Sequence, residues 1–324
     1  MKKRTIGWLI AATALILAGG ILFTGVMSVL NWDFRKLSTN RYETNTHAIT
    51  DAFTHISVTT TTAAVSFEPS EDGTVSVVCH EDANAKHRVA MEGDTLIIEQ
   101  EDHRKWYQHV GLNFEALSVT VYLPEGAYGD LTLRATTGKV YFSIYHTFDS
   151  MDVKVTTGEV SSFASVNGTA KIVTTTGHIH LKSLNAGSLD LSVSTGDIQM
   201  KNIHTGDLRM SVTTGETSAY RVKCVTLTSA GSTGDLLLRD VVAEDFFSIT
   251  RSTGDVVLED CDAAALTITT DTGDVTGTLR TQKQFAAHSD TGHVTLPHLP
   301  PAGGPCTITT DTGNVYITLT QTEE

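Results

Sequence analysis

Apolar residues recur at fixed distances from a repeated Thr-Gly pair over the C-terminal part of this 324-residue chain. Two positions after the glycine, nine of ten residues are aliphatic, and apolar residues also prevail five and seven positions before it. Residues two apart share one face of a β-strand. Each repeat is therefore predicted to hold a strand, a Thr-Gly turn and a second strand, with both apolar faces inward. The repeats are marked by Gly138, Gly158, Gly177, Gly196, Gly215, Gly234, Gly254, Gly273, Gly292 and Gly313.

The spacing of these glycines, 19 to 21 residues, predicts a solenoid. One unit cannot bury its apolar face, whereas stacked units about 4.8 Å apart form a continuous core. The glycine is expected to supply a positive φ in the tight turn, because only glycine adopts it at low cost. The predicted fold class is all-β: a single-stack parallel β-solenoid of about ten turns, with an irregular β cap at its N-terminal end and one transmembrane helix before it.

Residues 1–125 lack the repeat and divide into four segments. Residues 1–4 form a basic cytoplasmic tip, and residues 5–30 are apolar, uncharged and long enough to cross a bilayer. Residues 31–48 are interpreted as a juxtamembrane linker, residues 49–125 as the N-terminal β cap, and residues 126–324 as the regular solenoid. The basic tip predicts a cytoplasmic N-terminus and an extracytoplasmic solenoid on a single-pass cell-membrane protein. A cleavable signal peptide is the alternative to this signal anchor.

Charge and cysteine content narrow the function. The formal net charge of -14 disfavours nucleic acid as a partner, since phosphates require a basic face. The four cysteines share no column of the repeat, so free, mostly buried thiols are expected. No Cys or His pair has the spacing of a metal site, and neither a metal nor a cofactor is predicted. The cysteines are Cys79, Cys224, Cys261 and Cys306.

Two features are candidates for binding a partner. The residue after the glycine is acidic in four consecutive repeats, at Glu216, Asp235, Asp255 and Asp274. Such carboxylates are interpreted either as solvated turn residues or as an acidic stripe that attracts basic partners, and a single carboxylate column is a poor cage for calcium. The second feature is Trp106-Tyr107 in a predicted exposed, charged loop, where adjacent aromatic side chains either contact a partner or lipid or pack over the cap.

The pattern argues against an enzyme. Asp-Thr-Gly occurs at 271–273, 290–292 and 311–313, but aspartic proteases need two carboxylates facing each other across a lobe interface. Here the aspartates are expected to stack in one column in chain order. The inward positions are almost all apolar, apart from Ser229 and Gly231, so no cleft for sugar cleavage is predicted either. No catalytic residue is assigned.

From residue 49 to residue 319 the chain resembles the bacterial putative-adhesin family of β-solenoid domains, a domain of unknown function. The resemblance rests on Phe-Thr-His-Ile-Ser-Val at 53–58, on Val-Thr-Val-Tyr-Leu-Pro-Glu-Gly at 119–126, and on the repeated Ser/Thr-Thr-Gly-Asp-Val. It implies an extracytoplasmic or membrane-tethered domain, in some members with a link to envelope-stress signalling. It implies no catalytic residues.

Two functions are therefore expected, both non-catalytic. The first is a membrane-anchored extracytoplasmic β-solenoid that serves as an adhesin-like surface scaffold or binding module. The alternative is a cell-envelope stress sensing or regulatory protein that binds a membrane partner or a cationic peptide. The expected partners are the membrane, through the N-terminal helix, and an envelope protein, a peptide or a surface polymer.

Overall fold

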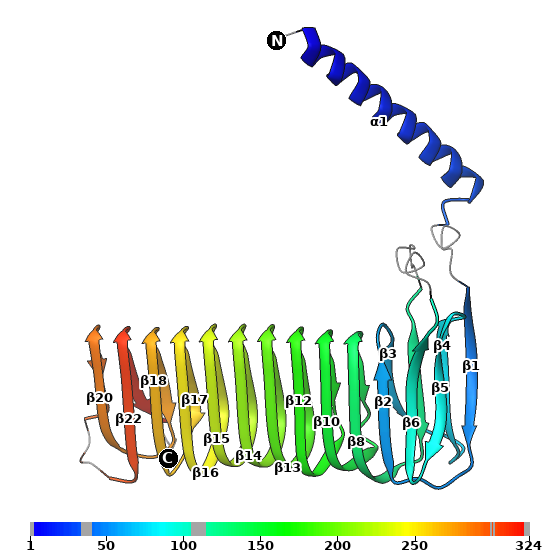
Figure 1. The fold of residues 1–324 in the computed structure, drawn as a ribbon. Helices are drawn as coiled ribbons and strands as arrows, with labels where there is room; N and C mark the ends of the chain where they lie inside the picture. The colour runs from blue at the N-terminus through cyan, green and yellow to red at the C-terminus, as the bar shows by residue number, and fades with distance from the viewer. Residues whose placement is uncertain (1–2, 34–40, 105–114, 299, 301, 321–324) are drawn as a thin grey trace.

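The computed structural model describes residues 3–33, 41–104, 115–298, 300 and 302–320. A helix, α1 (Lys3–Val29), precedes a long β-solenoid (Figure 1). The stretch Gly7–Val29 has a mean hydropathy of 2.2 and is long and apolar enough to cross a membrane. A signal sequence near the N-terminus has the same properties. The helix as such agrees with the sequence prediction.

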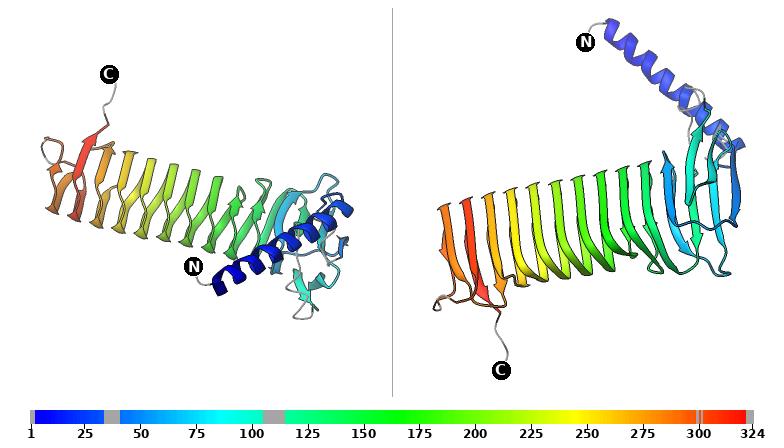
Figure 2. Two further views of the ribbon diagram at one scale, coloured as in Figure 1. Left: turned by 90° about the horizontal axis from the view of Figure 1, so that it is seen from above. Right: turned by 60° about the horizontal axis from the view of Figure 1, so that its bottom comes forward.

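The repeats form the predicted parallel solenoid, in which each strand pairs with its counterparts in the adjacent turns (Figures 1 and 2). In β13, β14 and β15, for example, Leu189 lies opposite Leu208 and Leu208 opposite Leu227. The strands from the first repeat onward are β8 (Gly126–Thr137), β9 (Val140–Phe142), β10 (His146–Thr157), β11 (Val160–Ser162), β12 (Ser165–Thr176), β13 (Ile179–Thr195), β14 (Ile198–Thr214), β15 (Thr217–Thr233), β16 (Leu236–Thr253), β17 (Val256–Cys261), β18 (Ala265–Thr272), β19 (Val275–Leu279), β20 (Gln284–Thr291), β21 (Val294–Thr295), β22 (Pro305–Thr312) and β23 (Val315–Leu319).

The Thr-Gly pairs form one corner of the solenoid. All ten glycines have φ between 124° and 156°. Their turns lie directly on one another: the N–H of Gly177 donates to the carbonyl of Thr195 at 2.9 Å, and a Cβ added to Gly177 would overlap the carbonyl oxygen of Gly158. Two separate reasons therefore require glycine at these positions. The backbone has a positive φ there, and a side chain would overlap the adjacent turn.

The opposite corner uses residues other than glycine. In β13 to β17 the chain passes through this corner by one residue in the left-handed region, with φ between 54° and 57°. Such a conformation costs about 1–2 kcal/mol per non-glycine residue, so the stacked ladder must hold it in place. The five residues are Ser183, Asn202, Arg221, Asp240 and Asp260.

The core is a set of apolar columns that run along the axis. Ile172, Leu191 and Met210 are successive members of one column, and each is at most 1% exposed. Burial of one such side chain stabilises the fold by about 2 kcal/mol. Another column is aromatic near its N-terminal end, where the rings of Phe67 and Phe142 stack at 4.9 Å.

The last two turns are stacked out of chain order. β22 pairs with β18 on one side and with β20 on the other, and β23 likewise lies between β19 and β21. In Figure 1 β20 therefore occupies the far end of the stack, with β22 inside it. This corrects the expectation that all turns stack sequentially: the neighbour of Asp271 in its column is Asp311, and Asp290 follows.

The N-terminal cap differs from the sequence prediction in three respects. First, β2 and β3 pair in parallel with β8 and β9, so they already form a solenoid turn. Second, β5 is a strand that the pattern missed. Third, residues 42–48 of the predicted linker belong to β1, which pairs antiparallel with β4. The cap strands are β1 (Tyr42–Ile49), β2 (His55–Thr60), β3 (Ala64–Pro69), β4 (Val75–Asp82), β5 (Ala85–Glu92), β6 (Thr95–Asp102) and β7 (Ser118–Leu123).

Candidate functional site

The acidic column lies along the Thr-Gly corner and contributes to the stacking of the turns. One carboxylate oxygen of Asp235 accepts a hydrogen bond from the backbone N–H of Asp255 at 2.8 Å. Asp255 does the same for Asp274, and Asp274 for Asn314, at 2.8 and 2.7 Å. Each side chain thus joins two turns, which gives a local reason for an Asp or Asn after the glycine. The carboxylates are held in a row at the exposed edge.

Glu216 occupies the same column with a longer side chain. Its own backbone N–H donates to Asp197 at 2.8 Å, so the column extends one turn further than the four residues predicted from sequence. The other sequence candidates, Trp106 and Tyr107, lie outside the described residues. The predicted contact of these aromatic side chains with a partner stays a prediction.

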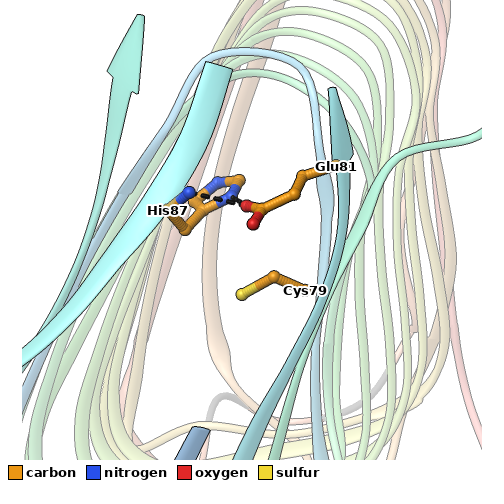
Figure 3. A group of neighbouring side chains, drawn as sticks. All are labelled: Cys79, Glu81 and His87. Atoms are coloured by element: carbon orange, nitrogen blue, oxygen red, sulfur yellow. Dashed lines mark hydrogen bonds and ion pairs between the residues drawn. The ribbon is translucent and has the colours of Figure 1, made fainter. Parts of the chain in front are cut away.

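A second cluster lies inside the N-terminal cap, where Cys79, Glu81 and His87 converge (Figure 3). Cys79 and Glu81 are two apart on β4 and so share one face, and His87 reaches them from β5 after the turn at 82–85. Their ligand atoms, the Cys79 thiol sulfur, a Glu81 carboxylate oxygen and a His87 ring nitrogen, all lie within 4.8 Å of one another. The three residues are 0%, 1% and 3% exposed.

Hydrogen bonds fix the orientation of the Glu81 and His87 side chains. One Glu81 carboxylate oxygen accepts from the Asn45 amide at 2.8 Å. The other accepts from the His87 backbone N–H at 2.6 Å and lies 2.8 Å from His87 Nδ1. His87 Nε2 lies 3.0 Å from Thr60 Oγ1. Every polar atom of the glutamate and the imidazole is thus fixed by a neighbour from β1, β2, β4 or β5.

Burial sets the protonation of the cluster. It lowers the pKa of His87 more than the hydrogen bond to Glu81 raises it. Burial, aided by the Glu81 charge, raises the pKa of the Cys79 thiol to about 12. A reactive cysteine needs a depressed pKa, so Cys79 is not activated as a nucleophile by its surroundings. Thiol, carboxylate and imidazole are, however, the donors that hold zinc and related metal ions.

Comparison with known families identifies the fold. Residues 53–324 match the family model described as Toastrack DUF4097. The chain belongs to this family. The resemblance drawn from the sequence motifs is confirmed, and it carries no established activity with it.

The solved structures that this Toastrack chain matches are distant from it in sequence. A putative adhesin from Parabacteroides distasonis is 13% identical, with a TM-score of 0.45 over 87% of this chain and 98% of that chain. A putative lipid binding protein from the same species is also 13% identical, with a TM-score of 0.43 and the same coverage of both chains. A putative adhesin from Parabacteroides merdae is 13% identical, with a TM-score of 0.41 over 86% and 97%. No functionally curated protein matches the sequence.

A cationic groove lies along the corner opposite the Thr-Gly pairs. We use this name for the hollow around His204, Arg221 and Lys223, and include Lys201, which lies over the ring of Tyr220, the residue before Arg221. Its two lobes, of about 580 and 250 Å³, share His204 and Lys223. The ring of Tyr220 holds the side chains of Lys201 and Arg221, whose charged groups lie 5.5 and 4.5 Å from its centroid.

The charges of this groove are unbalanced. In the part of the chain that the structure describes, none of Lys201, Arg221 and Lys223 has an ion-pair partner. Asp240 lines the smaller lobe, but its carboxylate is paired with Arg280. Glu244 is the one other carboxylate among the residues lining either lobe. Positive charge thus gathers on one surface of a chain whose net charge is -14.

Sequence reasoning missed both the cluster and the groove. Cys79 and Glu81 at strand spacing, followed by His87 across a short turn, form a signal for the cluster that requires β5 to be recognised as a strand. The groove combines basic residues five, six and eight positions after the glycine in two successive repeats, and its signal is the recurrence of basic residues at this distance from the glycine.

Proposed function

We propose that this protein is a non-catalytic, membrane-anchored binding module that holds its solenoid on the extracytoplasmic side as an adhesin-like surface scaffold. α1 is its anchor, because it is apolar over 23 residues and its most apolar 18-residue window is not buried in the protein. The ligand we assign to it is an anionic surface polymer bearing phosphate or carboxylate groups, held in the cationic groove.

The unpaired cations of the groove carry this proposal. Two other arginines of the repeats are paired: Arg239 with Glu259, and Arg280 with Asp240 and Asp260. Arg221 also sits at a position of positive φ, where Asn, Asp or Gly is the usual choice, so a long cationic side chain there costs stability. A side chain kept at such a cost, next to an aromatic ring that orients it, fits a binding role better than a structural one.

A rigid ladder suits a repetitive ligand. Successive turns present equivalent positions about 4.8 Å apart, so cations on adjacent turns face anions at short, regular intervals. Several weak contacts of this kind add up along a polymer, whereas one small anion meets only one or two of them. The expected binding is salt-sensitive, because the groove is exposed and its charges are screened.

The experiment compares two double charge reversals in the full chain, purified in detergent. Arg221→Glu/Lys223→Glu alters the groove, and Lys171→Glu/Arg209→Glu makes the same charge change on exposed strand residues elsewhere. Polyphosphate and polygalacturonate serve as the phosphate and carboxylate probes, with neutral dextran as the negative control. The groove variant should bind at least about tenfold more weakly than wild type, while the control variant keeps its affinity. Equal loss in both variants, or binding of dextran, would refute the groove as the site.

The regulatory alternative is favoured by the acidic row at the other corner. Asp235, Asp255 and Asp274 are held in register by their hydrogen bonds, which makes a fixed line of negative charge for a cationic peptide. The triple change of these residues to Asn removes the charge and keeps the oxygen that joins the turns, as Asn314 already does in this column. If an oligolysine probe binds wild type at low salt and not the triple variant, the row is a peptide site. Unchanged binding would rule it out.

A further inference from the structure

We propose that Cys79, Glu81 and His87 bind one zinc ion, which locks the N-terminal cap of the solenoid. This inference is independent of the proposed function, because the cluster is buried inside the cap and the cationic groove lies on the exposed corner of the repeats. Three observations carry it: the convergence of three different donor atoms, their support by outer hydrogen bonds, and the charge balance of the site.

The first observation is the geometry. A thiol, a carboxylate and an imidazole reach one point from two strands, with their donor atoms within 4.8 Å of one another. Donor atoms around a tetrahedral zinc at about 2.0–2.3 Å from the metal are themselves about 3.3–3.8 Å apart, so small side-chain rotations suffice to close the set. Sulfur, nitrogen and oxygen donors together suit zinc, which is borderline soft, and exclude calcium and magnesium, which take oxygen donors.

The second observation is the outer shell. With its proton on Nε2, His87 donates to Thr60 Oγ1 at 3.0 Å, which leaves Nδ1 as an unprotonated donor toward the metal. Nδ1 then faces a Glu81 carboxylate oxygen at 2.8 Å, and two acceptors at that distance require a proton or a cation between them. The Asn45 amide holds the other Glu81 oxygen at 2.8 Å and fixes the carboxylate plane. This arrangement is that of metal ligands already oriented by their neighbours.

The third observation is the charge. A Cys79 thiolate and a Glu81 carboxylate together carry two negative charges, which one divalent ion cancels in a site where an isolated charge is costly. Within the described residues, Glu81 has no lysine or arginine as an ion-pair partner. Its one ion pair in this part of the chain is with His87. On binding, the thiol proton and the proton shared by Glu81 and His87 leave to solvent, so two protons are released for each zinc ion.

His47 is the candidate for a fourth ligand, although its ring nitrogens do not lie within 4.8 Å of all three donors, so its side chain would have to move toward the ion. It lies on β1 two residues from Asn45, on the same strand face, and its Nε2 is a buried atom without a hydrogen-bond partner. His47 also interacts electrostatically with His87. A fourth ligand from β1 would join the strand nearest to α1 to β4 and β5, and so tie the cap together across three strands.

The experiment measures metal on the full chain in detergent after chelation and re-equilibration. Wild type should hold one equivalent of Zn²⁺, and the Co²⁺ form should show a thiolate-to-cobalt charge-transfer band in the near ultraviolet. Cys79→Ser should lose the band and the stoichiometric zinc. The matched control is Cys306→Ser, which removes a thiol equally buried and also with a pKa of about 12, but far along the chain in β22. That variant should keep both.

Two further measurements keep the proposal open to refutation if a variant folds poorly. Asn45→Ala leaves all ligands in place and should weaken zinc binding by about 10–100-fold. The melting temperature of wild type should rise with Zn²⁺ and fall with chelator, and this response should vanish in His87→Gln. A wild-type chain that holds no stoichiometric zinc, or a cobalt form without the thiolate band, overturns the proposal without reference to any variant.

Discussion

The buried Arg251 offers a quantitative test of the core. Its side chain is 1% exposed and lies in an inward column of the solenoid, in β16. It donates to Ser229 Oγ at 2.9 Å and to the carbonyl of Thr250 at 3.1 Å. The previous turn makes room for it: a Cβ on Gly231 would lie 2.6 Å from the guanidinium. The break at Ser229 and Gly231 seen in the sequence thus accommodates one charged side chain, which has no carboxylate partner among the described residues.

The cost of this charge follows from the pKa. Burial lowers the pKa of Arg251 from 12.5 to about 10. Each pKa unit corresponds to about 1.4 kcal/mol, so the charged form is disfavoured by about 3 kcal/mol in the folded chain relative to the unfolded one. At pH 7 the group is charged in both states and the whole penalty applies. It diminishes only as the pH rises through 10, where the folded state begins to lose the proton.

The test is a substitution of Arg251 by Met in a Ser229→Ala background. Methionine has a similar length and no charge, and the alanine avoids leaving the serine hydroxyl buried without a partner, which would cost about 1–3 kcal/mol. Ser229→Ala alone should destabilise the chain by about 1.5–3 kcal/mol, because it removes a hydrogen bond to a charged group. Adding Arg251→Met should then restore about 3 kcal/mol.

The assay is equilibrium unfolding in urea at pH 7, followed by circular dichroism. The two variants are compared with each other and with wild type, and only changes in midpoint at constant slope are read as changes in stability. If the double variant is no more stable than Ser229→Ala, the guanidinium pays no desolvation cost in this core. The assigned cause of the lowered pKa would then be wrong.

Four further outcomes test other parts of the fold. Gly196→Ala should destabilise by more than about 2 kcal/mol, because it adds left-handed strain and an overlap with the previous turn, whereas Gly126→Ala, whose Cβ would meet nothing within 4 Å, should be nearly neutral in the same urea assay. Asp255→Ala should cost about 1 kcal/mol, and Asp255→Asn less than half of that, since an amide oxygen accepts the same N–H. Burial lowers the pKa of His146, so the unfolded state binds its proton more tightly; stability should fall as the pH drops below 6.5, and less so in His146→Gln, as measured by melting temperature across pH. Deleting β22 and β23 should abolish amide-exchange protection in β20 and leave it in β16, because β22 is the paired neighbour of β20 in the described ladder.

Some of this structure could be predicted from local pattern alone. A period of 19 to 21 residues with apolar positions two apart admits few ways to bury the apolar faces, and stacking in parallel turns is the solution found. The Thr-Gly column predicted its own corner, because the backbone requirement for glycine is local. The helix of residues 3–29 follows from an uninterrupted apolar run. These features depend on residues close in the sequence, or on the equivalent residues of the adjacent repeats.

The features that the sequence did not predict depend on contacts between segments that are not equivalent repeats. No local signal places β22 between β18 and β20, since every repeat offers the same edge, and the choice is made by the whole stack. In the cap, β1 pairs antiparallel with β4, β5 with β6 and β4 with β7, whereas the strands of the repeats pair in parallel.

The repeat period by itself therefore determined that the chain is a solenoid, where its glycine corner lies and which positions are buried in the turns covered on both sides; Val294, in the last turn of the stack, is 41% exposed. Only the tertiary structure decided the order of the final turns, the meeting of Cys79, Glu81 and His87 in the cap, and the gathering of unpaired cations on one corner. The physical reason is that a repeat specifies contacts with its own kind, whereas a site is built where residues of different kinds are brought together by the fold.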